Sequence, residues 1–245
     1  MATIKSRIRK LMPLALLERF YVAYWRQHKD KFAKELGDAQ VVNLGITEQA
    51  YDRRNEFYQT IHNRYIGETP IIFLEFGVFQ GESILGWAAM NDHPNSRFIG
   101  FDTFEGLPEA WKNYDAGHFS TDRRVPETDD ERVHFVAGLF QDTLDDAVRN
   151  LPGGRRLVLH IDSDLYSAAL YILTRLHDQL VPGTLILFDQ WVDIHEYRAL
   201  TDYVGAYGTR LKLVGTMNDA FSKVVFQVEA RECDAASSPL PPLTP

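Results

Sequence analysis

The sequence predicts an α/β fold, in which a mostly parallel sheet carries helices on both faces. Two observations support this prediction. From about residue 70 onward, short apolar runs alternate with segments of helical periodicity, which is typical of repeated βαβ units. The last two apolar runs, 210–217 and 220–229, are separated only by a turn at Asn218 and Asp219, which predicts an antiparallel hairpin. A dehydrogenase sheet would instead close with a parallel strand.

Each element can be placed along the chain. The first strand, 70–77, is an uninterrupted apolar run after a proline, as expected for a strand buried in a parallel sheet. The longest helix, 165–180, ends before the turn at Pro182 and Gly183. The other strands before the hairpin are expected at 96–102, 132–138, 156–162 and 184–189. The other helices are expected at 83–90, 142–151 and 195–207.

The chain has 245 residues, enough for one large α/β domain or two small ones. We interpret residues 1–69 as an N-terminal helical extension and 70–229 as the α/β domain. Residues 230–245, rich in small residues and proline, are expected to be a disordered tail. The polar segment 103–131 is long for a βα connection, and loops of this length are often functional or mobile.

Composition limits the classes of function. The formal net charge is -8 with acids and bases interspersed, whereas a general nucleic-acid binder would show a basic stripe. The single cysteine, Cys233, excludes an internal disulfide framework and favours a reducing, cytoplasmic location. No run approaches the ~20 apolar residues needed to span a bilayer.

The N-terminal residues 1–32 begin basic and become amphipathic. Because Pro13 interrupts their short apolar core and no small-residue cleavage site follows, we do not expect a signal peptide. We expect a helix that packs on the domain or on a second subunit of a homo-oligomer. A peripheral membrane contact through four basic side chains is the weaker alternative. These side chains are Lys5, Arg7, Arg9 and Lys10.

Ligands of open α/β sheets bind outside the carboxyl ends of the strands, at the switch in strand order. At the end of the first strand, Glu75, Gly77 and Gly81 form the pattern E-x-G-x-x-x-G. Glycines in this turn let a ligand approach the backbone and the free amides of the next helix. The spacing differs from the pyrophosphate fingerprint G-x-G-x-x-G, and an ordinary tight turn explains it equally well.

Asp102, at the end of the second strand, favours nucleoside binding. It lies 25 residues after Gly77, where an acid suits the two hydroxyls of a ribose. A helix or turn cap is the alternative. Because a third glycine is absent, the nucleoside need not carry a pyrophosphate. S-adenosylmethionine fits, since it combines a ribose with an amino-acid tail and has no phosphate.

Two further strand ends carry acids. Asp162 follows the fourth strand, and Asp189 with Gln190 follows the fifth. Two carboxylates and an amide oxygen suit Mg²⁺ or Mn²⁺, unless the acids cap the helices that follow them. Asp164 stands where an N-cap would precede a helix, so capping and chemistry are both open for it. His160, inside a strand, is expected to be a hydrogen-bonded core histidine.

Six segments, in order, resemble the macrocin O-methyltransferase family of class I S-adenosylmethionine-dependent methyltransferases. They cover about residues 70–228 and read FLEFGVFQGES, GFDTFEGLPE, GLFQDTL, HIDSDLYSAALYIL, PGTLILFDQW and HEYRAL. The resemblance implies a Rossmann-like, three-layer α/β/α fold whose seven-stranded sheet has a reversed final strand. It also implies methylation of a hydroxyl on a sugar, a glycosylated metabolite or a polysaccharide, often with Mg²⁺.

The resemblance implies roles for individual residues. Expected cofactor contacts are Glu75, Gly77 and Gly81 for the methionine end, Asp102, Thr103 and Phe104 for the ribose, Gly138, Leu139 and Phe140 for the adenine, and also Ser83 and Asp162. Asp162, Asp189 and Gln190 fall on the metal positions, although the family usually has a second acid in place of Gln190. The base is expected to be Asp162 or Asp164, then His195, for which capping or surface exposure is the alternative.

Other interpretations stay open. An NAD-dependent enzyme would need G-x-G-x-x-G and usually Y-x-x-x-K, and the sequence has neither. A small phenolic metabolite is the alternative acceptor, and a non-catalytic binding module is the alternative to an enzyme. Specificity is expected from the N-terminal helices and from 103–131, which is either a lid or a packed surface loop. The lid residues would be Trp111, Tyr114, His118 and Phe119.

Overall fold

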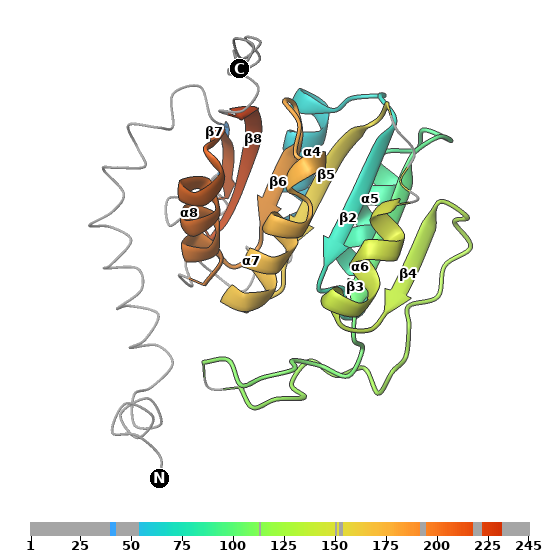
Figure 1. Ribbon diagram of the computed structural model, residues 1–245. Coiled ribbons are helices and arrows are strands. Elements are labelled where there is room, and N and C mark those ends of the chain that lie inside the picture. The colour runs from blue at the N-terminus through green and yellow to red at the C-terminus, as the bar shows by residue number, and fades with distance from the viewer. Residues whose placement is uncertain are drawn as a thin grey trace, which may run out of the picture.

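Among the residues that the structure describes, eight strands form one sheet in the order β1-β7-β8-β6-β5-β2-β3-β4 (Figure 1). The computed structural model describes residues 40–42, 54–112, 114–149, 151, 154–191, 195–217 and 222–231. The helix and membrane contact considered for residues 1–32 lie outside these ranges. So do the predicted turn at Asn218 and Asp219 and most of the predicted tail, including Cys233.

Seven of the strands confirm the predicted sheet. They are β2 (Ile71–Phe76), β3 (Arg97–Asp102), β4 (Val133–Ala137), β5 (Arg156–Ile161), β6 (Leu185–Phe188), β7 (Thr209–Met217) and β8 (Lys223–Arg231). β8 runs antiparallel to both β6 and β7, while the other pairs are parallel. The eighth strand, β1 (Gln40–Val42), pairs with β7 and lies where the sequence predicts only helices. Three residues are too few to show the alternation that marks a strand.

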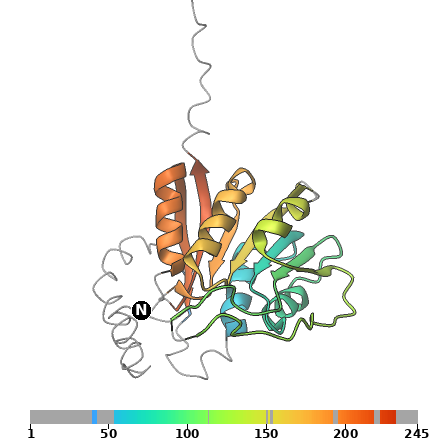
Figure 2. The same cartoon turned by 60° about the horizontal axis from the view of Figure 1, so that its bottom comes forward.

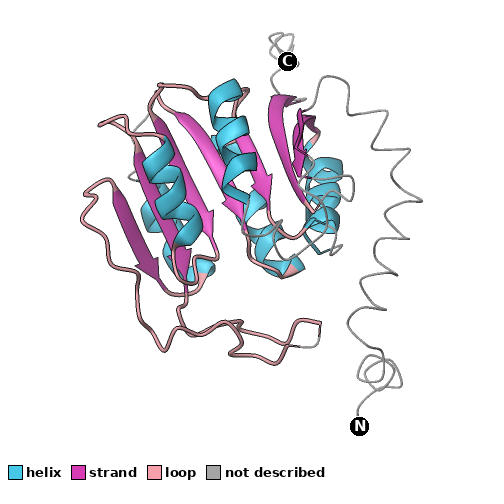
Figure 3. Ribbon diagram, turned by 180° about the vertical axis from the view of Figure 1, so that it is seen from behind, coloured by secondary structure: helices cyan, strands magenta, loops and turns pink. Residues whose placement is uncertain are grey.

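Helices cover both faces of the sheet, which Figures 1 and 3 show from opposite sides. α4 (Arg54–Tyr65) and α5 (Glu82–Met90) bury apolar side chains against one face. α6 (Phe140–Arg149), α7 (Tyr166–Arg175) and α8 (His195–Tyr207) do so against the other, which confirms the predicted three layers. The helix expected over 165–180 ends at Arg175 and is followed by a 3₁₀ turn, η1 (His177–Gln179), a common way for a helix to finish.

Helix α4 belongs to the same hydrophobic core as the sheet. Its Phe57, Tyr58 and Ile61 are almost fully buried. The helix approaches β7 so closely that a Cβ added to Gly215 would lie 2.4 Å from Cδ1 of Ile61. The domain boundary expected near residue 69 stays a prediction. Helix α4 lies within the predicted N-terminal extension, yet its side chains complete the core on one face of the sheet.

The order of strands changes direction at β2. From β2 the chain proceeds outward to β3 and β4, and it then places β5 and β6 on the other side of β2. Such a switch point creates a crevice at the carboxyl ends of the strands. The long connection between β3 and β4 passes across this edge of the sheet, which Figure 2 turns toward the viewer. None of the described helices is long and apolar enough to cross a membrane.

Candidate active site

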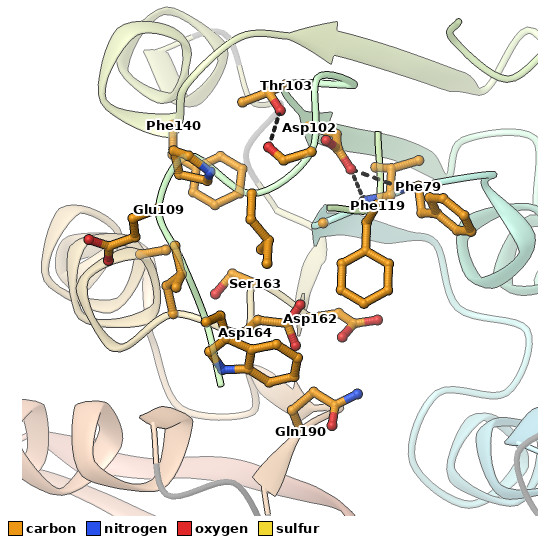
Figure 4. A pocket seen from close by; sticks show the side chains of 18 of the residues that line it. Phe79, Asp102, Thr103, Glu109, Phe119, Phe140, Asp162, Ser163, Asp164 and Gln190 are labelled. Carbon is orange, nitrogen blue, oxygen red and sulfur yellow. Dashed lines mark hydrogen bonds between the residues drawn. The ribbon is translucent and has the colours of Figure 1, made fainter. Parts of the chain in front are cut away.

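A cavity of about 910 Å³ opens at the switch point (Figure 4). Its walls come from the segments that follow β2, β3, β5 and β6, from the start of α6 and α7, and from the long connection after β3. Asp102, Thr103 and Phe140 lie on one side in Figure 4, and Asp162, Asp164 and Gln190 lie on the other. Side chains that the sequence spreads over almost 90 positions therefore share one space.

The glycine turn after β2 is shaped by a close approach to β5. Gly77 has φ +93°, and a Cβ at this position would lie 2.0 Å from the carbonyl oxygen of Asp162. No other residue fits without displacing the backbone of Asp162. Gly81 has φ +83° and is the N-cap of α5, where a Cβ would meet Pro126 at 3.0 Å. Both conformations lie in the left-handed region that favours glycine.

Asp102 fixes the same turn with its carboxylate. One oxygen accepts hydrogen bonds from the amides of Val78 (2.7 Å) and Phe79 (2.9 Å), and the other accepts from the amide of Phe104 (2.8 Å). Two of these hydrogen-bond donors, Val78 and Phe79, also line the cavity, and Figure 4 labels Phe79 together with Asp102. A carboxylate offers about four lone-pair sites, so Asp102 both caps the turn and keeps capacity for one ligand hydroxyl.

The predicted cofactor residues divide into two groups. Seven of them line the cavity, namely Gly77, Ser83, Asp102, Thr103, Leu139, Phe140 and Asp162. Four do not line it, namely Glu75, Gly81, Phe104 and Gly138. Phe104 is buried in the core beside Phe135, and Glu75 points into the face of the sheet that α4 and α5 cover.

Glu75 belongs to a buried polar cluster behind the cavity, which also contains Tyr58, His160, Asp189 and Lys223. Nδ1 of His160 lies 2.8 Å from Glu75, and Nε2 lies 3.4 Å from Oδ1 of Asp189. Tyr58 donates to the same Oδ1 at 2.7 Å, and the ammonium of Lys223 contacts Oδ2. His160 is therefore the hydrogen-bonded core histidine that the sequence predicts.

Within the buried polar cluster, charge pairing and hydrogen bonds change the pKa values of His160 and Asp189 more than burial does. Burial alone would lower the pKa of His160, but hydrogen bonds to Asp189 and Glu75 raise it to about 9. Burial alone would raise the pKa of Asp189, but Lys223 and His160 hold it well below its usual range. The cluster therefore holds an ionised Asp189 against two cationic side chains at neutral pH.

The residues predicted to bind Mg²⁺ do not fit a divalent ion. Asp162 and Gln190 line the cavity, but Asp189 does not. Its two oxygens already contact Tyr58, His160 and the ammonium of Lys223. Across the described ranges, no group of three or more His, Cys, Asp or Glu side chains is arranged to hold a metal ion.

Of the residues predicted to act as the base, Asp162 and Asp164 line the cavity. Burial first, and then repulsion from Asp189, raises the pKa of Asp162 to about 7. Asp164 is buried and has φ +59°, a strained conformation for a residue with a side chain. The N-cap residue of α7 is Leu165, one position after Asp164.

Of the remaining predicted bases, His195 does not line the cavity. Its Nδ1 accepts a hydrogen bond from the amide of Tyr166 at 3.3 Å, which fits the capping alternative.

The next residue, Glu196, was not predicted from the sequence. It is fully buried and accepts a hydrogen bond from the amide of Gln190 at 3.0 Å. Burial, followed by Asp162 and Asp164, raises its pKa well above the usual value. No signal in the sequence separates Glu196 from a surface acid of α8.

The connection after β3 folds back on itself above the cavity. Leu107 and His118 pair through their backbones, as do Trp111 and Tyr114 farther along, so the described residues between 106 and 118 form an arm. The rings of Trp111 and Tyr114 stack 5.6 Å apart. Of the predicted lid residues, Trp111, Tyr114 and Phe119 line the cavity, whereas His118 packs behind Tyr114.

Phe79, in the glycine turn, was not expected at the site. It has φ +52°, is 41% exposed, and packs edge-on against Phe119 at 6.1 Å. Figure 4 shows both rings at the cavity mouth. An aromatic residue between two closely spaced glycines is the signal in the sequence that could have identified it.

The strand order, the reversed final strand and the pocket at the switch point define the class I methyltransferase fold. Two solved structures share it. The O-methyltransferase NovP aligns with a TM-score of 0.57 at 20% identity, over 86% of this chain and 100% of that one. The calicheamicin methyltransferase CalS11 aligns with a TM-score of 0.54 at 18% identity, over 86% and 92% of the two chains. At these identities the likeness establishes the fold.

The chain belongs to the macrocin-O-methyltransferase (TylF) family, whose family model matches residues 6–214. A relative from Streptomyces olivaceus, 8-demethyl-8-(2,3-dimethoxy-alpha-L-rhamnosyl)-tetracenomycin-C 4'-O-methyltransferase, is 30% identical over 162 residues. That alignment covers 57% of this chain and 60% of the relative. Mycinamicin III 3''-O-methyltransferase from Micromonospora griseorubida is 35% identical over 75 residues, 28% of each chain. The chain thus spans less than two thirds of the length of either relative.

Proposed function

We propose that this protein is an S-adenosylmethionine-dependent O-methyltransferase that acts on a hydroxyl group of a sugar or glycosylated metabolite. The observation that carries this proposal is the cavity of about 910 Å³, with the glycine turn and Asp102 on one side and Asp162 and Asp164 on the other. Membership of the family supports methyl transfer to oxygen. The name of one relative, which describes O-methylation of a rhamnosyl compound, supports a sugar acceptor.

The glycine turn suits a nucleoside with an amino-acid tail. Gly77 lets the turn pack directly against the carbonyl group of Asp162, where any side chain would overlap it. Asp102 holds the amides of Val78 and Phe79 in place and keeps capacity for a ribose hydroxyl. Phe140, at the start of α6, supplies an apolar surface for an adenine. When bound, S-adenosylmethionine supplies a methyl group activated by its sulfonium.

The proton of the acceptor hydroxyl needs a base within the cavity. We assign this role to Asp162, because a base is most effective when its pKa lies near the working pH and that of Asp162 is about 7. Asp164, on the same wall, is the second candidate and would orient the acceptor. Placing the hydroxyl oxygen in line with the methyl group supplies much of the rate without further chemistry.

The acceptor would lie under the arm formed by residues 106–118. Trp111 and Tyr114 present stacked rings to the cavity, and aromatic rings pack readily against the apolar face of a sugar. The same rings would accept a planar phenol, which makes a phenolic metabolite the second candidate acceptor. Lys112, 4.1 Å from the Trp111 ring, adds a positive charge beside this surface.

Calorimetric titration with S-adenosylmethionine and S-adenosylhomocysteine tests the cofactor. We expect micromolar binding that is lost in Asp102→Ala. Incubation with labelled S-adenosylmethionine and a panel of rhamnosides and phenols then tests the acceptor, with Asp162→Asn as the inactive control. Absence of cofactor binding by the folded protein would overturn the proposal, and labelling of phenols alone would favour the second candidate.

We also expect a homo-oligomer, because the amphipathic N-terminal residues suit packing between subunits. Light scattering on the full chain tests this expectation. A particle mass of 28.1 kDa, that of one chain, would contradict it.

A further inference from the structure

The acid pair predicted to bind a metal, Asp162 and Asp189, already has a cationic side chain beside Asp189. Lys223 is 4% exposed, and its ammonium contacts Oδ2 of Asp189. The contact follows from the strand register, because Phe188 lies opposite Val224 in the antiparallel pair β6–β8. The next residues outward along this register are Asp189 and Lys223.

Asp189, one of these two acids, has little capacity left for another cation. The second oxygen of Asp189 accepts from Tyr58 at 2.7 Å and lies 3.4 Å from His160. This leaves Asp162 and the uncharged amide of Gln190, both of which line the cavity. Mg²⁺ requires six oxygen ligands in near-octahedral geometry and is usually held by one or two carboxylates with substrate and water.

A divalent ion would also meet electrostatic opposition. An ion bound between Asp162 and Asp189 would lie beside the buried ammonium of Lys223, and like charges repel strongly where water is excluded. The side chain of Lys223 is 5% exposed and that of Asp189 is 1% exposed, so neither can swing into solvent without leaving a buried partner unpaired.

We propose that the ammonium of Lys223 takes the place of a divalent cation at the acid pair, so that this protein binds no divalent ion at Asp162, Asp189 and Gln190. The inference deepens the proposed function and rests on it. Lys223 supplies a fixed positive charge at Asp189, outside the lining of the cavity. It is a positioning residue, since it acts through the two acids and does not line the cavity.

Electron paramagnetic resonance of Mn²⁺ tests this proposal without an acceptor. Free Mn²⁺ gives a strong signal that decreases on binding. Wild type should leave the signal unchanged, with or without S-adenosylmethionine. Lys223→Ala should bind Mn²⁺ roughly tenfold or more tightly than wild type, because it removes the competing charge. Lys223→Gln, which keeps a hydrogen-bond donor, should do the same and serves if the alanine variant does not fold.

Lys223→Arg is the matched control, because it retains the positive charge and should behave like wild type. A merely structural role for Lys223 would make the glutamine and arginine variants alike. Stoichiometric Mn²⁺ binding by wild type would overturn the proposal, and so would equally weak binding by wild type and the folded variants. A parallel titration with S-adenosylmethionine separates this failure from failure of the proposed function, since cofactor binding does not require the ion.

Discussion

Replacement of Gly77 by alanine tests whether the contact between the glycine turn and β5 shapes the cofactor site. Gly77 has φ +93°, and its added Cβ would lie 2.0 Å from the carbonyl oxygen of Asp162 and 2.9 Å from the carbonyl carbon. Gly183 is a matched control, because it has φ +94° and nothing lies within 4 Å of its added Cβ. The two alanine variants therefore share the backbone strain and differ in the steric overlap.

The expected magnitudes follow from these two terms. An L-residue held at such a positive φ costs roughly 1–2 kcal/mol, so Gly183→Ala should lower the free energy of unfolding by about that amount. Overpacking of a rigid contact adds about 1–3 kcal/mol. Gly77→Ala should therefore cost about 2–5 kcal/mol in total. Because relief of the overlap moves the backbone of Asp162, affinity for S-adenosylmethionine should also fall on the order of 10- to 100-fold.

Urea unfolding followed by circular dichroism measures the first quantity, and calorimetric titration measures the second. Gly183→Ala should bind S-adenosylmethionine as wild type does, because it lies in the turn before β6, away from the cavity. One result would refute this reasoning: both variants lose the same stability, and Gly77→Ala binds S-adenosylmethionine as wild type does. The close approach of Gly77 to the backbone of Asp162 would then not shape the cofactor site.

Three further predictions concern single side chains. Burial raises the pKa of Asp162 to about 7, so turnover should rise as the pH passes 7. Because this folded pKa exceeds the ordinary value of 3.8, stability should fall as the pH rises from 3.8 to about 7. In Asp162→Asn, the free energy of unfolding measured in urea should fall less steeply with pH than in wild type. An unchanged pH dependence would contradict the raised pKa of Asp162. Tyr58→Phe should cost about 1–3 kcal/mol, since it strips a donor from a buried carboxylate. Tyr65→Phe loses one hydrogen bond to the carbonyl of Val214 and should lower the free energy of unfolding by about 0.5–1.5 kcal/mol. An equal loss of stability in both variants would contradict a special contribution of Tyr58 to the buried polar cluster. Trp111→Ala should raise the KM for the acceptor about tenfold or more and leave cofactor affinity unchanged, whereas the exposed Val181→Ala should change neither; a loss of cofactor affinity alone would contradict the acceptor role.

Residues that directly follow a strand were placed well from the sequence. Gly77, Asp102 and Asp162 each come within one residue of a strand end, and the carboxyl ends of parallel strands share one edge. Their presence in the cavity therefore follows from chain order and the parallel direction alone. The position of the arm beside the cavity was also predictable, because a long polar connection with several aromatic residues at that edge has few other places to lie.

The direction in which buried strand residues point was not predictable in the same way. β2 is buried along its whole length, so apolar residues occupy both faces and no polar alternation marks the orientation of Glu75. The contact of Asp189 with Tyr58 was equally hidden. It depends on how α4 packs on the sheet, and a separation of 131 residues along the chain leaves no local signal of it. Long-range pairs of this kind are fixed by tertiary packing and not by local pattern.

The reversed final strand explains how a lysine reaches the edge where ligands bind. In a wholly parallel sheet every strand starts at the opposite edge, so a residue at the start of a strand cannot approach the carboxyl ends. β8 runs antiparallel to β6, and its first residue, Lys223, therefore arrives beside the end of β6 at Asp189. The sequence predicts the hairpin but begins its second strand at 220, so the contact between Lys223 and Asp189 did not follow from the prediction. At that position Lys223 supplies the internal cation that we propose takes the place of a divalent ion at Asp162 and Asp189.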